Sequence, residues 1–361
     1  MLTKKQFLFS SVRRGSNRGL EMDLKFSRDE CLNLENSLKS EWLETNGLGG
    51  YASSTIVDCH TRKYHGLLVA PLEKQNGKFV LLSRLDPVIH VNEHTFQLST
   101  NKFPEVFHPT GHKYINFFEC LTHPRTVYHI GDIELERSVL MPQGENTVIV
   151  EFKLKAADKP ITFHLNPKLA YRSIHALTRE NMFLRVKTYV RDGVYIVDPY
   201  EGMPALYMDT SMQTEFFPGP YWMRNVEYLK ERSRGFDYQE DLFCPGVIEC
   251  TLKKSDVLYF RASIMPPKVP IAKLWKAELE RRKKEWTAIK EKDLAIKALK
   301  YHASQLIIQN AQSKPSIVAG YHWFDEWGRD AMISVPGLTW ECGKPEVGRD
   351  ILITFASLEK N

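Results

Sequence analysis

A dense group of residues suited to binding a polar ring lies near the end of this 361-residue chain. Residues 319–330, here called the signature segment, read AGYHWFDEWGRD and hold four aromatic residues, three carboxylates, one Arg and two Gly. Aromatic side chains offer flat apolar faces, while Arg and Asp offer forked donors and paired acceptors. This mixture favours a surface that binds the hydroxyls and the apolar face of a sugar.

The same segment also fits a structural role. Asp330 precedes an apolar run, residues 331–338, that predicts the core side of a helix. An Asp at a helix start is stabilised by free backbone N–H groups whatever the protein does. On this interpretation Asp330 caps the helix and the Trp residues pack beneath it, and spacing alone does not decide between the two.

A second unusual passage covers residues 41–55 (EWLETNGLGGYASST) and 61–68 (TRKYHGLL). Gly47, Gly49 and Gly50 allow backbone conformations barred to other residues, so we expect a tight bend or the close approach of another surface. The run lacks the Lys-Ser/Thr and βαβ setting of a phosphate-binding loop. A third cluster, residues 221–241, mixes aromatic and charged residues and fits either a salt-bridged loop across a domain interface or a sugar contact.

Composition and charge exclude several classes of protein. The net charge of +5 is small for this length, and the one dense basic run, residues 281–284, has Glu residues beside it in a helical stretch, so no nucleic-acid partner is expected. No window is apolar enough to span a membrane. The six Cys are scattered without metal-ligand spacing, which predicts free thiols, no metal site and a cytoplasmic protein.

The pattern of residues divides the chain into a β part and a helical part. Val148, Val150, Phe152 and Leu154 alternate with other residues as in a half-buried strand, and Asn76-Gly77 and Asp192-Gly193 are hairpin signals. The latter joins predicted strands at 183–190 and 194–197, and a short helix is expected around 31–39. We therefore expect a large antiparallel β-sandwich.

Helical periodicity begins after the prolines at 266–270. It predicts helices over residues 271–291 and 294–310, a third from about residue 331 and a fourth over 347–358. The expected organisation is a basic, disordered extension (1–21), a β-sandwich domain (22–266), a linker helix (267–292) and the start of a helical domain (293–361).

Four motifs carry a resemblance to a known family. Residues 41–55, 61–68, 234–242 (RGFDYQEDL) and 319–330 occur in this order over nearly the whole chain, which resembles the glycogen debranching enzymes of bacterial and archaeal type, the amylo-α-1,6-glucosidases. The resemblance implies an N-terminal β-supersandwich followed by an (α/α)6 barrel. It also implies hydrolysis of the α-1,6-linked glucose at a glycogen branch, with inversion and without a metal or organic cofactor.

The resemblance further implies roles for individual residues. The segment 327–330 is similar to the W-x-R-D of glucoamylase-like sites, so Arg329 and Asp330 are expected to hydrogen-bond the terminal glucose and Trp323, Phe324 and Trp327 to form the pocket walls. The family's general acid and general base lie in later motifs that this chain does not contain, so no catalytic residue is assigned. Asp325 and Glu326 are adjacent in a loop and do not suit the two faces of one bond.

Three interpretations stay open. The chain is a debranching enzyme truncated early in its catalytic domain, or one part of a split enzyme whose second chain completes the barrel, or a non-catalytic glucan-binding module or remnant. The expected partner in each case is glycogen or a branched α-glucan. An incomplete barrel also predicts partly uncovered apolar faces around Leu299, Leu306, Ile333 and Leu338.

Overall fold

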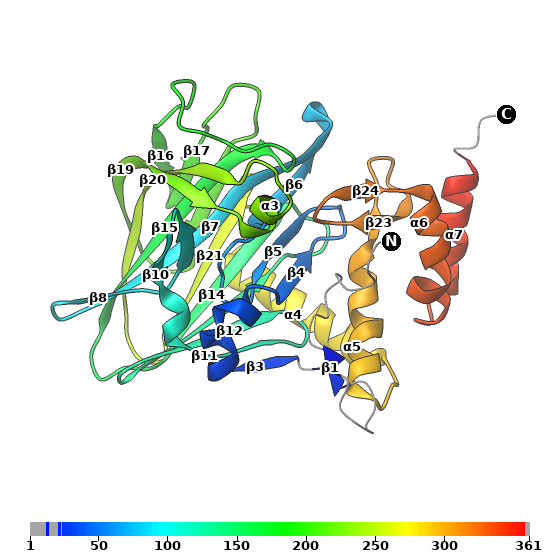
Figure 1. The fold of residues 1–361 in the computed structure, drawn as a ribbon, viewed down its shortest axis with the longest axis horizontal. Helices are drawn as coiled ribbons and strands as arrows, with labels where there is room; N and C mark the ends of the chain where they lie inside the picture. Colours follow the sequence, from blue (N-terminus) through cyan, green and yellow to red (C-terminus); the bar gives the residue numbers. More distant parts are fainter. Residues whose placement is uncertain (1–11, 14–20, 23, 358–361) are drawn as a thin grey trace.

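A β-sandwich makes up most of the molecule, and helices follow it (Figure 1). The computed structural model describes residues 12–13, 21–22 and 24–357. Within them, the larger sheet has nine antiparallel strands in the order β16-β17-β18-β21-β14-β13-β12-β11-β3. Its strands are β3 (Lys25–Ser27), β11 (Ile115–Cys120), β12 (Pro124–Ile130), β13 (Ile133–Leu140), β14 (Thr147–Ala156), β16 (Thr188–Arg191), β17 (Val194–Val197), β18 (Leu206–Thr210) and β21 (Val257–Ser263).

The second sheet of the described residues has eight strands on the path β19-β20-β15-β7-β6-β5-β4, with β8 paired to β7. Its strands are β4 (Glu41–Thr45), β5 (Tyr51–Thr55), β6 (Gly66–Leu72), β7 (Gly77–Val91), β8 (His94–Gln97), β15 (Ile161–Ser173), β19 (Glu215–Glu227) and β20 (Gln239–Leu252). Small elements complete this part: β1 (Val12–Arg13) with β2 (Glu21–Met22), β9 (Thr100–Phe103) with β10 (Val106–Thr110), α1 (Arg28–Leu32), α2 (Leu34–Ser37), η1 (Glu73–Gln75), η2 (Gly111–Tyr114) and α3 (Leu229–Ser233).

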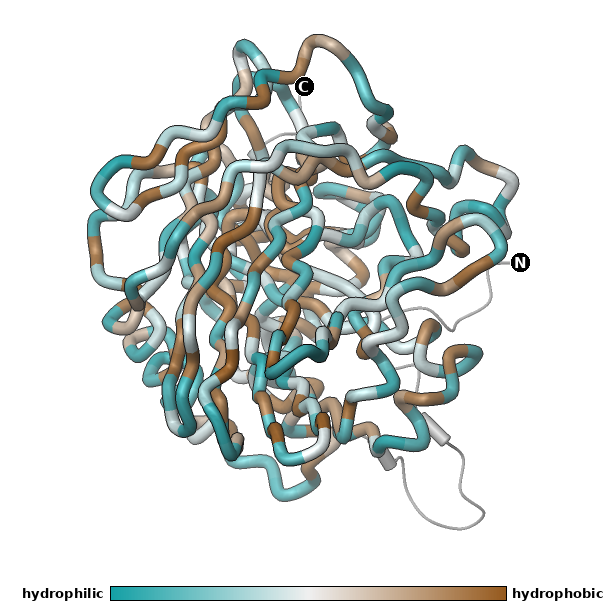
Figure 2. The backbone as a smooth tube through the Cα atoms, turned by 90° about the vertical axis from the view of Figure 1, so that its left-hand side faces the viewer, coloured by the Kyte–Doolittle hydropathy of each residue, from teal (hydrophilic) through white to brown (hydrophobic). Residues whose placement is uncertain are grey.

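The core lies between the two sheets. Hydrophobic and hydrophilic residues alternate along many strands (Figure 2), which is the period of a strand with one face in a core. Val148, Val150, Phe152 and Leu154 of β14 are fully buried in it, as the alternation predicts. Ile149, on the opposite face of β14, is also buried, because Ile271 and Trp275 of the first long helix cover it.

The helical part runs from residue 271 to residue 356. Its elements are α4 (Ile271–Ala288), α5 (Leu294–Ala303), η3 (Ser304–Leu306), the three-stranded sheet β22 (Ile307–Gln309), β23 (Pro315–Gly320) and β24 (Phe324–Glu326), then α6 (Gly328–Val335), the π-helical η4 (Pro336–Trp340) and α7 (Pro345–Ala356). The fold class expected from the sequence, an all-β domain followed by helices, is confirmed. No described helix is long and apolar enough to cross a membrane.

Some local predictions were wrong. The helix predicted over 294–310 ends at Ala303, because the β-branched pair Ile307 and Ile308 forms strand β22 against β23. The strand predicted over 183–190 begins only at Thr188. Before it, the Asn181 side chain accepts a hydrogen bond from the Phe183 N–H and favours a turn instead.

The two hairpin signals were right. Asn76, with a φ of 49°, ends η1 and leads into β7, whereas Asp192 and Gly193 form a two-residue turn with φ of 49° and 76°, the left-handed values that such a turn requires. The short helix expected around residues 31–39 is present as α1 and α2. The extension predicted to be disordered, residues 1–21, falls mostly outside the described residues.

The apolar faces expected to be uncovered are partly exposed. Leu299 on α5 is 44% exposed and Ile333 on α6 is 74% exposed, while Leu306 and Leu338 are half-buried. Large exposed side chains of this kind mark a surface suited to contact with another apolar surface.

Candidate functional site

The signature segment joins the small sheet to helix α6. It begins at the end of β23, turns, forms β24 and enters α6. Asp330 is therefore the third residue of α6, and Trp327 holds the cap position without a side-chain cap bond. The interpretation of Asp330 as the helix cap is thus wrong, because β24 leads directly into a helix that begins at Gly328. As an acid in the first turn, Asp330 still favours the helix.

The first half of the signature segment is anchored on the β-sandwich. Tyr321 is buried, its hydroxyl donates to the backbone oxygen of Gln305 at 2.7 Å, and its ring meets the edge of Tyr51 at 5.4 Å. His322 Nε2 lies 2.9 Å from Ser53 Oγ. Because the Ser53 hydroxyl already donates to the Trp42 carbonyl at 2.6 Å, we assign the proton of this contact to His322 Nε2.

A buried ionic group lies beneath this contact. Arg62 Nε donates to Glu41 Oε1 at 2.7 Å, and His65 Nε2 lies 3.2 Å from the same oxygen. The backbone N–H of Thr61 donates to His65 Nδ1 at 3.2 Å, which assigns the His65 proton to Nε2, facing Glu41. The Arg62 guanidinium also lies over the Trp323 ring, 5.0 Å from its centroid.

The protonation states of this group follow from its burial. Burial alone would raise the pKa of Glu41, but the hydrogen bond from His65 and the Arg62 charge hold that pKa well below its usual range. Burial lowers the pKa of His65. Burial, with the neighbouring His65 and Arg62, lowers the pKa of His322 to about 3. Both imidazoles are therefore neutral at pH 7.

An ion pair fixes the start of the second half of the segment. Lys78 of β7 is buried, and its Nζ lies 2.6 Å from Asp325 Oδ1 and 5.1 Å from the Tyr321 ring centroid. Glu326 Oε1 accepts a long 3.5 Å hydrogen bond from Asn310. Asp325 is thus held by a cation of the β-sandwich, which does not suit it to proton transfer.

The rest of the segment points away from the sandwich. Phe324 and Trp327 are each 53% exposed, with ring centroids 6.3 Å apart. Arg329 is exposed and Asp330 half-buried, and neither side chain forms a hydrogen bond or ion pair with the described residues. Two aromatic faces, one guanidinium and one carboxylate are therefore uncommitted on a fixed strand and helix start.

The five predicted site residues are thus divided between two environments. Phe324, Trp327, Arg329 and Asp330 lie on the outward half, whereas Trp323 packs against Arg62 and His322. The anchoring residues Glu41, Ser53, Arg62 and His65 belong to motifs that the sequence singled out, but their contact with the signature segment was not predicted. Lys78 lies outside every motif, so no sequence signal identified it.

The other unusual motifs have structural roles here. Gly47 has a φ of 73°, and a Cβ at this position would lie 1.9 Å from Gln143 Nε2, so the expected close approach is present. In the cluster 221–241, Glu240 is buried and accepts two hydrogen bonds from Arg172 at 2.6 and 2.9 Å. The cluster is therefore salt-bridged, but the bridge joins the neighbouring strands β15 and β20 within the sandwich and does not lie in a loop across a domain interface.

Elsewhere, the described residues line two further cavities, among others. One, of about 220 Å³, lies where α4, α5 and β22 meet the sandwich, and the other, of about 540 Å³, lies at one end of the sandwich. The five predicted site residues line neither of them. Among the described residues, no group of three or more His, Cys, Asp or Glu side chains is placed to hold a metal ion.

Comparisons with solved structures give two similar chains of low identity. A bacterial glucoamylase complexed with acarbose shares 9% identity with a TM-score of 0.39, over 92% of this chain and 49% of that one. A putative kojibiose phosphorylase from the human microbiome shares 12% identity with a TM-score of 0.34, over 78% of this chain and 37% of that one. This chain therefore spans half or less of the length of either structure. A comparison with curated proteins gave no match.

Family models match two stretches of the chain. Residues 40–259, well over half of the chain, match the model described as glycogen debranching enzyme N terminal. Residues 301–361 match the model described as amylo-alpha-1,6-glucosidase. These matches include all four motifs and both halves of the site, and the chain belongs to the glycogen debranching enzyme family.

Proposed function

We propose that the outward half of the signature segment binds a terminal glucose of a branched α-glucan. The observation that carries this proposal is the set of uncommitted groups on an anchored support: Trp327 and Phe324 offer apolar faces, and Arg329 and Asp330 offer hydrogen bonds. Binding at such a site costs less ordering entropy when its support is already fixed. The contacts of His322 with Ser53 and of Asp325 with Lys78 supply that support.

For an enzyme of this family that contains the general acid and the general base, we propose hydrolysis of α-1,6-linked glucose at glycogen branch points, with inversion. Inversion requires a carboxylic acid on one side of the bond and a carboxylate that activates water on the other, roughly 6.5–9.5 Å apart. The signature segment does not offer such a pair, since Asp325 is bound by Lys78 and Glu326 is its neighbour. The proposed role of the signature segment is to bind the sugar, and residues outside this segment supply the general acid and the general base.

A second candidate function is glucan binding without catalysis by this chain. The ion pair between Asp325 and Lys78 favours it, because that pair removes a carboxylate from proton transfer while leaving the sugar-binding groups free. The two candidates share the binding site and differ in glucose release. We expect this chain alone to release a negligible amount of glucose from a phosphorylase limit dextrin, and clear turnover by the pure chain would contradict that expectation.

The binding proposal is tested with Trp327→Ala and a matched control. Trp340→Ala removes a Trp that is similarly exposed but lies in η4, outside the signature segment. Affinity for the limit dextrin, measured by isothermal titration calorimetry, should fall by about tenfold in Trp327→Ala, about 1.4 kcal/mol. It should stay unchanged in Trp340→Ala. Equal affinity of Trp327→Ala and the wild type would refute the proposed site.

A further inference from the structure

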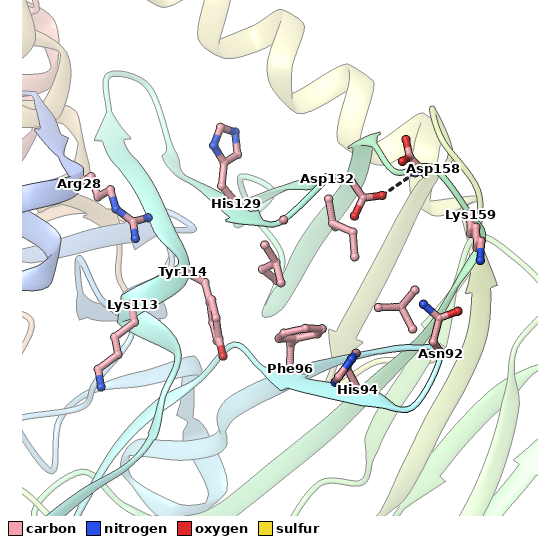
Figure 3. Close-up of a pocket in the computed structure, with 14 residues that line it drawn as sticks. Arg28, Asn92, His94, Phe96, Lys113, Tyr114, His129, Asp132, Asp158 and Lys159 are labelled. Carbon is pink, nitrogen blue, oxygen red and sulfur yellow. Dashed lines mark hydrogen bonds between the residues drawn. The ribbon is translucent and has the colours of Figure 1, made fainter.

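The larger cavity lies at one end of the β-sandwich, far from the signature segment. It has a volume of about 540 Å³, within the range of about 300–1,000 Å³ typical of small-molecule sites. Its walls come from the start of α1, the β7–β8 hairpin, η2, and the turns that follow β12 and β14 (Figure 3). In Figure 1, β8 and α6 lie on opposite sides of the molecule.

The floor of this cavity is apolar and aromatic. Ile130 and Ile133 are buried beneath it, and the half-buried Phe96 and Tyr114 pack against the main core. The two rings stand almost perpendicular, at 88°, with centroids 5.8 Å apart. They form an aromatic corner that presents flat apolar surface to whatever enters the cavity (Figure 3).

The rim is polar and carries both signs of charge. Asn92, Asp132, Asp158 and Lys159 line it and are exposed. One Asp132 oxygen accepts the Asp158 N–H at 2.8 Å, while the Asp158 carboxylate and the Lys159 ammonium form no ion pair with the described residues. Donors and acceptors therefore stand uncommitted around an aromatic corner.

The balance of charge narrows the class of ligand. Three cations, those of Arg28, Lys113 and Lys159, and two carboxylates, those of Asp132 and Asp158, line the cavity. The carboxylates disfavour a strongly anionic ligand, and the ring of polar groups disfavours a purely apolar one. A neutral ring with an apolar face and many hydroxyls satisfies both the corner and the rim.

We infer that this cavity is a second α-glucan contact site, which holds one or two glucose residues of a chain of the same polymer without reacting with them. The identity of the ligand rests on the proposed function, and the inference deepens it. A branched glucan presents many chains, so two separate contacts on one molecule raise its apparent affinity well above that of either contact alone. A short oligosaccharide cannot bridge the two sites and gains nothing from the pair.

The test compares glycogen with maltotriose. Tyr114→Ala removes half of the aromatic corner and should weaken glycogen binding by about tenfold, because one of two linked contacts is lost. Calorimetry with maltotriose should show two sites in the wild type and one in Tyr114→Ala. Glycogen affinity is measured by affinity gel electrophoresis on the whole chain.

A second variant tests the cavity site even if Tyr114→Ala does not fold. Asn92→Gly removes a rim side chain at a φ of 53°, a conformation that Gly adopts freely, and should weaken glycogen binding by about threefold. Its matched control is Asn76→Gly, at the other end of β7 with a φ of 49° and no part in the cavity. That control should bind glycogen as the wild type does.

Including Trp327→Ala separates this inference from the proposed function. Wild-type glycogen affinity in Asn92→Gly, or in folded Tyr114→Ala, overturns the cavity site while leaving the signature segment untouched. Loss of affinity in the cavity variants with wild-type affinity in Trp327→Ala supports the cavity and refutes the signature segment as a binding site. Loss of affinity in both sets supports both sites.

Discussion

Replacing Arg282 with Met removes a buried cation that joins α4 to the β-sandwich. Arg282 is almost fully buried and Glu44 entirely so. Arg282 Nη2 and Nη1 donate to the two oxygens of Glu44 at 2.6 and 3.0 Å, and its Nε donates to Glu278 at 2.8 Å. Glu44 is in motif 41–55, so this perturbation also reaches the strand that borders the site.

The magnitude follows from what is left behind. Arg282→Met strands the Glu44 carboxylate in the interior, whereas Glu278 keeps two hydrogen bonds from Arg281. Removing one partner of a buried pair costs about 3–5 kcal/mol. For a domain of this size the loss lowers the melting temperature by about 6–20 °C.

The assay is thermal unfolding followed by circular dichroism at pH 7. Arg281→Met is the matched control, because Arg281 is the preceding residue of α4 and its side chain is 41% exposed against 5% for Arg282. Arg281 is partly exposed, and in Arg281→Met the buried Glu278 keeps its hydrogen bond from Arg282, so this control should lose much less stability than Arg282→Met. The double variant Glu44→Leu with Arg282→Met removes the stranded charge and should recover part of the loss.

A clear result would refute this reasoning. Should Arg282→Met and Arg281→Met lower the melting temperature equally, burial of the pair would not be what makes Arg282 important. Should the double variant be less stable than Arg282→Met alone, the cost would arise from lost packing and not from the stranded carboxylate.

Two further predictions concern the support of the signature segment. The pKa of His322 is lowered from 6.5 to about 3, so the folded state holds a neutral ring, and stability should be lost as the pH falls from about 6.5 toward 4. The melting temperature of His322→Gln should fall less steeply over this pH interval. An unchanged slope would count against the neutral state assigned to His322. Lys78→Met should release Asp325, and amide hydrogen exchange over residues 324–327 should then be faster and limit-dextrin binding several-fold weaker. The control Lys74→Met, at an exposed Lys, should change neither exchange nor binding. Exchange as slow in Lys78→Met as in the wild type would show that the ion pair does not fix β24.

Much of the fold could be predicted from local sequence patterns. Alternation at Val148 to Leu154 identified a strand, and Asn76-Gly77 and Asp192-Gly193 identified hairpins, because these signals depend on residues close in sequence. The small sheet of β22, β23 and β24 could not be read in this way. Its three-residue strands β22 and β24 become strands only through their partner β23, so helical periodicity wrongly covered the first of them.

Part of the candidate site could also be predicted from residues close together in the sequence. The types of Phe324, Trp327, Arg329 and Asp330 predicted a sugar-binding surface, and the structure exposes three of these residues and half-buries Asp330, while their binding role stays a proposal. The inward orientation of Trp323 depends on Arg62, which is remote in sequence. No local sequence signal marks Lys78, because its role comes from the ion pair with Asp325, which is remote in the sequence.

The most direct test of the central claim is the affinity of this chain for a phosphorylase limit dextrin, measured for the wild type, Arg329→Ala and Arg349→Ala. Arg349 is an exposed Arg of α7 whose ion pairs lie outside the signature segment. If Arg329 hydrogen-bonds the terminal glucose, its loss should cost about 1.5–3 kcal/mol, tenfold or more in affinity, while Arg349→Ala binds as the wild type does. Equal affinity in Arg329→Ala and Arg349→Ala, or no binding by the wild type, would contradict the account.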